Sequence, residues 1–535
     1  RKRSYIDFYI ELEGELGFVD LMTKLVDLGL DFNKLKDQRE KPLNTCYLDK
    51  DELITGAVER IRDINVIPSP YLTGLLDEYF DLPLVPMMET TRGCPFVCTF
   101  CADGIKAKSR VFRFDHDRTR DELHYIARKV KNVDELIIAD LNFAMYKEDI
   151  DTAKSVRDIQ KLYNYPTLFS ASAGKNKPKR TIEVSDIIQG WTLGASIQST
   201  SPEVLKAIKR SNISTAAYKE LVDYGNSLPK SKTHSEVILG LPGDTKERHF
   251  ESLRFGIDNN VNSIRMFQAM MLSGTEMADR DNREKFGLVT KFRTIPGCIG
   301  IYDLLDDKHP IAEIEEIIVG SDTLSQDDYL ECRILNLIVE TFHNNAIFEE
   351  AFALVRTLEV SPFDCMIYIK DHPEKYIDRI HQIIKAFIYE TTNDLFDTFE
   401  EASQYVLNPE VIARYIGGEL GTNELLLHRA LLFREFEVIC DLLFDAIKEN
   451  LRKENKLSNA VSNYLNELQR FSILRKKNPF ENTESIFTST FSYDFEAIRD
   501  AAYMINPNDF PPLDSPEEFC FFHDEDQRQH ISNQV

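Results

Sequence analysis

Short apolar runs alternate with amphipathic stretches between about residues 84 and 275. The apolar runs are "LPLVPMMET", "ELIIADLNF", "TLFSASAGK", "TLGASIQST", "SEVILGLPG" and "SIRMFQAMM". Stretches with helical spacing separate them, among them "DTAKSVRDIQKLYN", "SPEVLKAIKR" and "TKERHFESLRFGIDN". This alternation predicts a parallel sheet with helices outside it. Six such units predict an α/β fold, a partial (β/α)6 TIM-like barrel, over residues 81–305.

The pattern changes after residue 305. Long amphipathic segments with almost no Gly or Pro follow, such as "DYLECRILNLIVETFHNN" and "NELLLHRALLFREFEVICDLLFDAIKENL". They predict an all-α C-terminal domain over residues 306–535, acidic on its outer faces. Residues 1–80 are a short mixed segment in which "GELGFVDLMTKLVDLGL" predicts a helix.

Charge and cysteine usage exclude several classes of protein. The 535 residues carry a formal net charge of −25, which argues against nucleic acid and anionic membranes as partners. We find no apolar run of about 18 residues, the length that a membrane span needs. Most of the nine cysteines are scattered singly, which favours a reducing cytoplasm over a secreted disulfide scaffold.

Polar residues gather where the predicted strands end. In parallel barrels the chemistry lies at the C-terminal ends of the strands. The residues at these ends are a cysteine loop after the first strand, Asp140 and Asn142 after the second, Ser172 and Lys175 after the third, Ser196 and Gln198 on the fourth, Gly240 to Gly243 after the fifth, and Gln268 within the sixth.

The cysteine loop reads "TTRGCPFVCTFCADG" and holds Cys94, Cys98 and Cys101. A structural disulfide needs thiols in pairs, and a closed zinc site needs four ligands. Three thiolates in eight residues therefore indicate a metal centre with one open position. Three structural thiols, or a zinc site with a distant fourth ligand, stay open as the alternative at this point.

The Cys-x3-Cys-x2-Cys spacing after the first strand of a βα array resembles the signature of the radical S-adenosylmethionine (SAM) superfamily. The segments "SIQSTSPEVLKAIKR" and "EVILGLPGDT" then recur in the family's order, so that the resemblance covers roughly residues 60–300. It implies a [4Fe–4S] cluster held by Cys94, Cys98 and Cys101, with SAM on the fourth iron. It also implies an electron donor such as flavodoxin or ferredoxin.

The resemblance implies roles for the other strand-end residues. Phe100 packs beside the adenine, and Gly240 in "GLPGDT" lets the backbone approach it. The segment "IADLNF" replaces the family's Gly-Gly-Glu-like turn, so Asp140 and Asn142 are expected at the methionine ammonium. The further cofactor-binding residues are Ser172, Lys175 at the methionine carboxylate, Ser196 and Gln198 at the ribose hydroxyls or that carboxylate, and Gln268 in the barrel lumen.

Two segments resemble the cobalamin-associated branch of this superfamily. "YIDFYIELEGELGFVDLM" at residues 5–22 is similar to the last strand and helix of an upstream cobalamin-binding domain, and "INVIPSPYLTGLLDEYF" to the linker after it. The "RGCPFVCTFC" form of the cysteine loop also belongs to this branch. Residues 1–80 are therefore expected to be the remnant of such a domain in a fragment of a longer protein, which binds cobalamin through the upstream domain.

The expected activity is methyl transfer to a small-molecule substrate with cobalamin as a further cofactor. A radical SAM rearrangement or oxidation without cobalamin is the first alternative. A methylthiotransferase acting on tRNA is disfavoured because the C-terminal domain is acidic and helical. A non-enzymatic iron–sulfur or zinc regulator leaves the strand-end polar residues unexplained.

Overall fold

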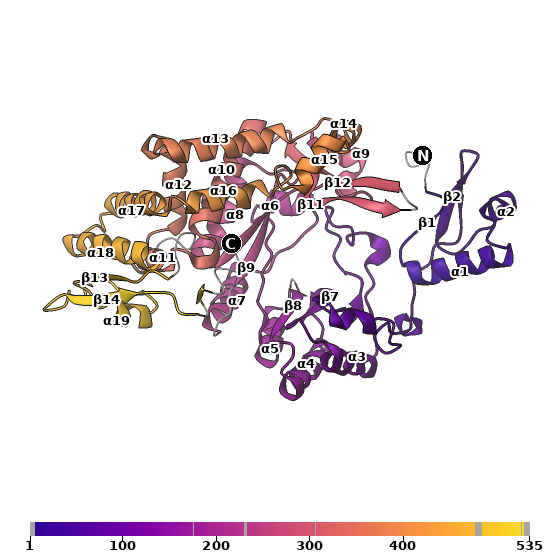
Figure 1. Ribbon diagram of the computed structural model, residues 1–535, viewed down its shortest axis with the longest axis horizontal. Coiled ribbons are helices and arrows are strands. Elements are labelled where there is room, and N and C mark those ends of the chain that lie inside the picture. The colour runs from indigo at the N-terminus through magenta and orange to yellow at the C-terminus, as the bar shows by residue number, and fades with distance from the viewer. Residues whose placement is uncertain are drawn as a thin grey trace. The chain divides into compact units, whose positions relative to one another are not determined.

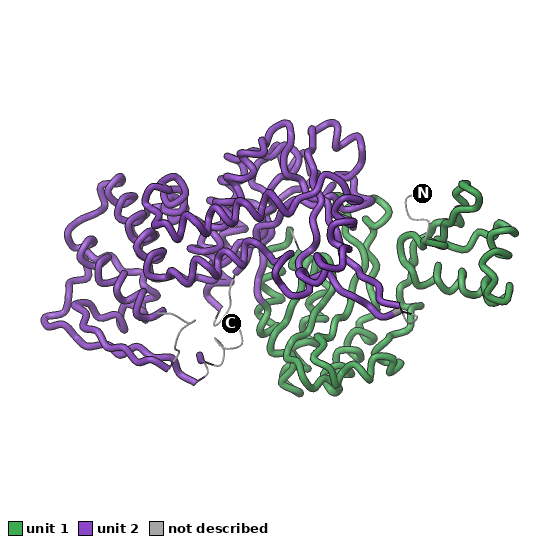
Figure 2. Tube along the Cα trace, turned by 45° about the horizontal axis from the view of Figure 1, so that its top comes forward, with its two compact units in different colours: residues 1–97, 103–191 green, residues 98–102, 192–535 purple. Residues whose placement is uncertain are grey.

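The computed structural model describes residues 6–174, 176–228, 233–304, 307–476, 484–525 and 527–528. The chain divides into two compact units (Figure 2). Unit 1 comprises residues 1–97 and 103–191, and unit 2 comprises residues 98–102 and 192–535. The middle of the cysteine loop therefore belongs to unit 2, although the residues on both sides of it belong to unit 1.

Unit 1 begins with a small antiparallel sheet of order β1-β2-β3, on which α1 packs. Leu21, Leu25, Leu35, Tyr47 and Ile54 form the core of this layer. The strands and helices involved are β1 (Tyr9–Ile10), α1 (Gly14–Asp27), α2 (Phe32–Asp37), β2 (Thr45–Asp49) and β3 (Glu52–Thr55). The predicted helix at "GELGFVDLMTKLVDLGL" is thus confirmed as α1.

The second part of unit 1 is a parallel sheet of order β4-β7-β8 with helices against it (Figure 1). The apolar run "ELIIADLNF" is β7 in full. Phe143, Phe169 and Trp191 pack their rings edge to face beside β8, which closes the core there. The elements are β4 (Met87–Met88), β5 (Thr91–Arg92), β6 (Phe112–Arg113), α3 (His116–Lys129), β7 (Glu135–Phe143), α4 (Asp149–Tyr163), β8 (Leu168–Ala173) and α5 (Pro178–Ile187).

Unit 2 continues the βα pattern. β9 (His234–Leu239) and β10 (Ser263–Gln268) pair in parallel, and Gly194 and Gln198 form parallel bridges to β9. Helices α6 (Pro202–Ala207) and α7 (Thr215–Ser227) precede β9, and α8 (Lys246–Asp258) lies between β9 and β10. Ser201 caps α6 by accepting from the Val204 N–H, as "SPEV" predicts, because a short side-chain oxygen satisfies a free helix donor.

The rest of unit 2 is mainly helical, and its colour in Figure 1 runs from red-pink at β11 and β12 through orange to yellow at the C-terminal end. Its elements are α9 (Arg280–Lys285), β11 (Val289–Leu304), β12 (Asp307–Gly320), α10 (Gln326–Phe342), α11 (Glu349–Thr357), α12 (Pro362–Asp371), α13 (Asp378–Asn393), α14 (Phe399–Val406), α15 (Pro409–Ile416), α16 (Glu424–Phe433), α17 (Phe436–Lys453), α18 (Asn459–Arg475), β13 (Phe487–Phe491), α19 (Phe495–Asp500) and β14 (Glu517–Phe521). The α/β class with a helical C-terminal region is confirmed.

The expectation that residues 306–535 are purely α-helical needs a correction. β12 and the β13–β14 hairpin lie in this range. Strand periodicity explains them: in "FTSTF" the side chains of Phe487, Ser489 and Phe491 fall on one face and those of Thr488 and Thr490 on the other.

One continuous apolar core joins the strands and the helical region of unit 2. Val237 of β9 and Ile264 of β10 belong to the same buried cluster as Leu335 of α10, Phe348 and Leu443 of α17. The helical region is therefore part of the packing that supports β9 and β10. In the described ranges, no helix combines the length and apolar character that crossing a membrane requires.

Candidate functional site

Cys94 lies in unit 1 directly after β5, in a loop with a strained backbone. Its N–H donates to the Lys108 carbonyl at 3.0 Å, and its side chain is buried. Gly93 before it has φ of +112°, and a Cβ atom there would lie 2.5 Å from the Arg110 carbonyl oxygen. Only glycine fits this position, because the backbone passes too close to the returning chain for any side chain.

Asn142 and Asp140 lie two residues apart on β7 and act differently. The Asn142 amide donates to the Cys94 sulfur, with Nδ2 to Sγ at 3.3 Å, and its buried Oδ1 has no protein partner. Asp140 accepts from the N–H groups of Thr90 and Thr91 at 2.7 and 2.9 Å, and from the Thr90 hydroxyl. Burial raises the pKa of Asp140, and these hydrogen bonds oppose the rise. Asp140 thus holds the strand that leads into the cysteine loop.

Ser172 lies at the same end of the sheet as Asn142. Ala173 next to it pairs with Phe143 in the register of β7 and β8, and Ser172 is solvent-exposed. Lys175, predicted at the methionine carboxylate, lies outside the described residues. The roles of Asp140, Ser172 and Lys175 toward SAM stay predictions.

Cys98 and Cys101 lie in unit 2, where the tip of the loop is anchored by backbone hydrogen bonds. The Thr99 N–H donates to the Ile208 carbonyl at 3.1 Å, and the Met277 N–H donates to the Thr99 carbonyl at 2.9 Å. Phe100 packs against an apolar cluster that contains Leu241 and Met271. The loop tip is therefore fixed by groups from the end of α6 and from the segment after β10.

Arg210 lies beside these two cysteines, and the sequence patterns did not identify it. Its guanidinium donates to the Asn212 side chain and to the Ser196 carbonyl, and the side chain is buried. Burial lowers the pKa of Arg210, while Cys98, Glu236 and Cys101 raise it. A buried cation therefore lies beside two of the three cysteines of the loop.

Ser196 and Gln198 meet a carboxylate, Glu236 of β9. The Ser196 hydroxyl donates to Glu236 Oε2 at 2.7 Å, and Gln198 Nε2 donates to the same oxygen at 3.3 Å. Gln198 Oε1 is buried without a protein partner, and the Gln198 backbone has φ of +60°. The cluster therefore offers one hydroxyl, one free amide oxygen and one carboxylate. Glu236 was missed because "SEVILGLPG" reads as a strand, in which an acid can equally face solvent.

Gly240 begins a tight turn after β9 and has φ of +85°. The turn ends at Asp244, whose side chain accepts from the Thr245 N–H at 3.0 Å. Burial raises the pKa of Asp244 to about 7. The turn thus combines the predicted open backbone with a buried carboxyl group that the sequence alone did not single out.

Gln268, at the end of β10, is engaged by the helical region. The Tyr329 hydroxyl donates to Gln268 Oε1 at 2.5 Å, and Gln268 Nε2 donates to Glu424 Oε1 at 3.4 Å. Glu424 also accepts a hydrogen bond from Arg333 at 2.6 Å. Burial by itself raises the pKa of the Glu424 carboxyl, but the charges of Arg333 and Arg293 outweigh burial, so that the pKa is lowered. Gln268 is thus part of a polar network with α10 and α16, and its contact with SAM stays a prediction.

Comparison with known proteins identifies the family. Residues 88–256, from β4 into α8, match the model of the radical SAM superfamily. This part of the chain is a radical SAM domain. The cofactors of the family are a [4Fe–4S] cluster and SAM, and the predicted family resemblance is confirmed.

Two curated relatives extend beyond this domain. The 2-(S-pantetheinyl)-carbapenam-3-carboxylate methyltransferase of Streptantibioticus cattleyicolor is 27% identical over 363 residues, which are 64% of this chain and 50% of the relative. The cobalamin-dependent radical SAM methyltransferase TokK of Streptomyces tokunonensis is 28% identical over 363 residues, with the same shares. The chain thus spans about half the length of the curated relatives that it matches.

A solved structure is also similar. The radical S-adenosylmethionine methyltransferase TsrM from Kitasatospora setae, bound to tryptophan and a SAM analog, matches 61% of this chain and 66% of its own, with 13% identity and a TM-score of 0.42. At this score the likeness supports no conclusion.

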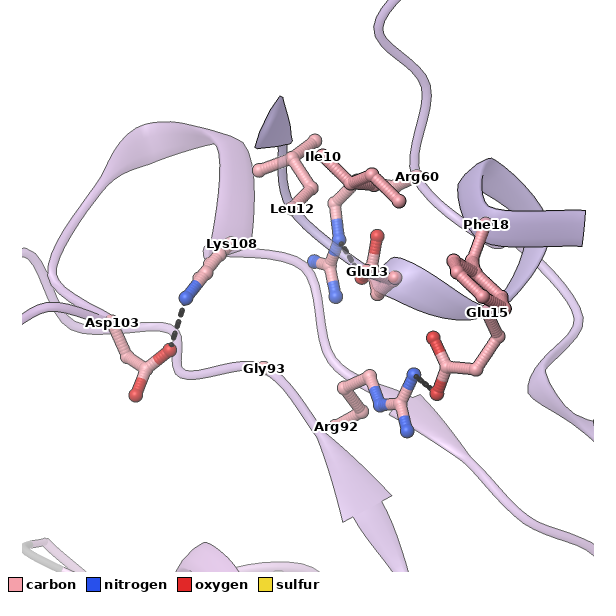
Figure 3. A pocket seen from close by; sticks show the side chains of 11 residues that line it. Ile10, Leu12, Glu13, Glu15, Phe18, Arg60, Arg92, Gly93, Asp103 and Lys108 are labelled. Atoms are coloured by element: carbon pink, nitrogen blue, oxygen red, sulfur yellow. Dashed lines mark hydrogen bonds and ion pairs between the residues drawn. The ribbon is translucent and has the colours of Figure 1, made fainter. Parts of the chain in front are cut away.

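A cavity of about 690 Å³ lies in unit 1, lined by residues of the N-terminal segment and of the start of the radical SAM domain (Figure 3). The start of α1 lines it with Glu13, Gly14 and Glu15, and the chain beside the cysteine loop lines it with Arg92 and Gly93. The other lining residues are Ile10, Leu12, Phe18, Arg60, Asp103 and Lys108. The "ELEGEL" stretch and the cysteine loop, far apart in sequence, thus border one hollow.

Proposed function

We propose that this chain is part of a cobalamin-dependent radical SAM methyltransferase that acts on a small molecule. The observation that carries the proposal is the pair of relatives over 363 residues, both named methyltransferases, together with the radical SAM domain. The "ELEGELGF" and "IPSPYLTGLLDEYF" stretches, which resemble the cobalamin-associated branch, support it. None of the nine cysteines, which all lie in the described ranges, forms a disulfide, and this suits the cytoplasmic location and the flavodoxin or ferredoxin donor that we propose with it.

Cys94, Cys98 and Cys101 would hold the cluster. Across the described residues, no three Cys, His, Asp or Glu side chains form a ready-made metal site, so the spacing and the family match support this assignment. The surroundings of the thiols fit thiolate ligands, because Asn142 donates to the Cys94 sulfur and Arg210 lies beside Cys98. When bound, the cluster supplies the electron that cleaves SAM.

Residues around the loop would bind SAM through complementary groups. Gln198 Oε1, which is buried without a protein partner, and Glu236 can accept from ribose hydroxyls, and Ser196 orients that carboxylate. Asn142 Oδ1 is likewise free to accept from the methionine ammonium. The Gly240 turn would bring its backbone to the adenine, and Phe100, which packs on the same apolar cluster as Leu241, would supply an aromatic face there. Each group satisfies a polar part of SAM without a change of its own protonation.

The first experiment tests the cluster. After anaerobic purification and reconstitution, the protein should carry about four irons with thiolate-to-iron absorption near roughly 400 nm. Cys94→Ala, Cys98→Ala and Cys101→Ala should each abolish that absorption. Cys298→Ala is the matched control, because Cys298 is exposed and lies outside the loop. Stoichiometric zinc without iron would contradict the assignment.

The second experiment tests the reaction. Full-length enzyme is incubated with methyl-deuterated SAM, cobalamin and candidate small molecules, and the label is followed by mass spectrometry. Deuterium in the product, together with 5′-deoxyadenosine and S-adenosylhomocysteine, supports methyl transfer. Formation of 5′-deoxyadenosine alone, independent of cobalamin, would favour a radical rearrangement or oxidation instead.

A further inference from the structure

The cavity of unit 1 has a balanced set of charges. Among its lining residues, Glu13 pairs with Arg60 at 2.7 Å, Glu15 with Arg92 at 2.8 Å, and Asp103 with Lys108 at 2.9 Å, as the dashed lines in Figure 3 mark. Three acids thus face three bases. The formal charges of the lining side chains therefore cancel, which favours a neutral polar ligand over a charged one.

Two carboxylate oxygens in this cavity are left without partners. Glu13 and Glu15 each use Oε1 in the ion pair, while Oε2 of both residues is buried with no hydrogen bond. The Glu13 side chain is only 8% exposed. A buried acceptor without a donor costs about 1–3 kcal/mol of stability. A ligand N–H that binds one of these oxygens removes that cost, so its hydrogen bond there is more favourable than one to water.

The cations of the two pairs also make other contacts. Arg60 also donates to the Arg110 carbonyl at 2.8 Å and lies over the Phe112 ring. Arg92 holds Glu89 with two further nitrogens, at 2.7 and 3.0 Å. Both guanidinium groups are therefore held by further contacts, and each forms its ion pair with Oε1 of its glutamate, which leaves Oε2 without a hydrogen bond.

Donor groups stand next to these acceptors. Helix α1 starts at Gly14, its N-cap residue Glu13 makes no side-chain cap, and a Cβ atom at Gly14 would meet nothing within 4 Å. The first N–H groups of a helix have no partner inside it. The start of α1 thus presents backbone N–H donors and carboxylate acceptors side by side, and Ile10, Leu12 and Phe18 supply apolar surface around them.

We propose that this cavity binds primary carboxamide groups on an apolar body, with Glu13 and Glu15 accepting the amide N–H groups and the first turn of α1 donating to the amide oxygen. A corrin carries such carboxamides around its rim, so this inference rests on the proposed cobalamin dependence and assigns residues of this chain to that cofactor. Both glutamates act as binding and positioning residues, since neither needs to exchange a proton.

The test measures corrin binding by absorption spectroscopy on full-length protein with its cluster reconstituted. Hydroxocobalamin is titrated first. Dicyanocobinamide, which keeps the carboxamides, is then compared with dicyanocobyrinic acid, in which carboxylates replace them. We expect wild-type protein to bind cobinamide about 10- to 100-fold more tightly than the carboxylate analogue, because the free glutamate oxygens repel carboxylates.

The variants are Glu13→Gln and Glu15→Gln, which keep an oxygen for Arg60 and Arg92. Each should weaken hydroxocobalamin binding about 10-fold and reduce the preference for cobinamide, because the new amide can donate to a carboxylate. Glu78→Gln is the matched control, since Glu78 is an exposed acid of unit 1 outside the cavity. Iron content and thermal unfolding show whether each variant is folded. The ratio of the affinities for cobinamide and for the carboxylate analogue, measured on one variant, does not depend on the fraction of that variant that is folded.

Two results would overturn the inference and are distinguishable. If wild-type protein with an intact cluster fails to bind hydroxocobalamin, the cobalamin part of the proposed function fails together with the inference. If wild-type protein binds it, but both variants keep the same affinity and the same preference for cobinamide, the two glutamates do not contact the corrin and the inference alone fails.

Discussion

At the scale of the residue, the Asn142 amide lies where it would tune the proposed cluster. Its N–H donates to the Cys94 sulfur from inside β7, and such bonds stabilise the more negative, reduced state of an iron–sulfur cluster. We therefore expect Asn142→Ala to lower the reduction potential of the cluster, measured by an anaerobic redox titration followed by electron paramagnetic resonance. Iron content should stay unchanged, since the three thiols remain.

The control for this prediction is Asn132→Ala. The Asn132 amide donates only to the Asp81 carbonyl on the exposed surface of the same unit. This variant should keep the wild-type potential. Equal potentials for Asn142→Ala and wild type would mean that the N–H group does not act on the cluster.

Asp244 makes stability depend on pH. Burial raises its pKa to about 7, above the ordinary value of 3.8. Between these two values the native state binds the proton more tightly than the unfolded state does. Asp244 therefore costs little stability below about pH 4 and progressively more as the pH rises to about 7, after which the cost stays constant.

The measurement is urea unfolding of wild type and Asp244→Asn at several pH values between about 4.5 and 8. The difference isolates this carboxyl from all others, because the asparagine keeps the oxygen that accepts from Thr245. The variant should gain free energy of unfolding relative to wild type as the pH rises. A difference that is independent of pH would refute the raised pKa.

At the scale of the element, the cysteine loop depends on Gly93. Its φ of +112° and the 2.5 Å approach to the Arg110 carbonyl both exclude a side chain. Gly93→Ala should lower the free energy of unfolding by at least about 1–3 kcal/mol, the cost of a strained residue, and should reduce the iron bound on reconstitution because Cys94 moves with the loop.

Gly74→Ala is a control that introduces the backbone strain of a positive φ without the steric clash expected at Gly93. Gly74 has φ of +76°, but a Cβ atom there would find its nearest neighbour at 3.8 Å. This control should lose about 1 kcal/mol and bind iron normally. If Gly93→Ala bound as much iron as this control, the close approach would not position the loop.

At the scale of the whole molecule, the helical region supports β9 and β10. Ile264 of β10 exchanges two backbone hydrogen bonds with the Asn344 side chain, at 2.8 and 2.9 Å, and the buried His249 of α8 hydrogen-bonds Asn336 at 2.9 Å. A chain that ends after Gly320 should therefore not reach the native state, although the sequence pattern places a domain boundary near residue 306.

The reason is the shared core. Exposing a Val, Leu or Ile that is now buried costs about 1.5–3 kcal/mol, and Val237, Ile264, Leu253 and Ile257 share this core with the helices after residue 320. Exposure of several such side chains is comparable to the total stability of about 5–15 kcal/mol of an ordinary protein. Near-ultraviolet circular dichroism and dye binding check this prediction, and a soluble truncated chain with native-like spectra would contradict it.

The sequence alone determined the features that depend on neighbours along the chain. The spacing of Cys94, Cys98 and Cys101 pointed to the family, and the apolar run of β7 predicted that strand to its ends. The helix start at Ser201 followed from one side chain and the N–H three residues later. These features are readable because the interacting groups lie within a few residues of one another.

The tertiary structure decided which strand-end residues have which partners. Asp140 reads like a cofactor ligand, yet its oxygens are taken by Thr90 and Thr91, about 50 residues earlier. Gln268 is held by Glu424, 156 residues away. The free oxygens of Glu13 and Glu15 arise because Arg60 and Arg92 reach only one oxygen of each. A local sequence pattern cannot predict such pairings. Each of these side chains could pair with many other residues of a long chain, and only the packed core determines which of them lies beside it.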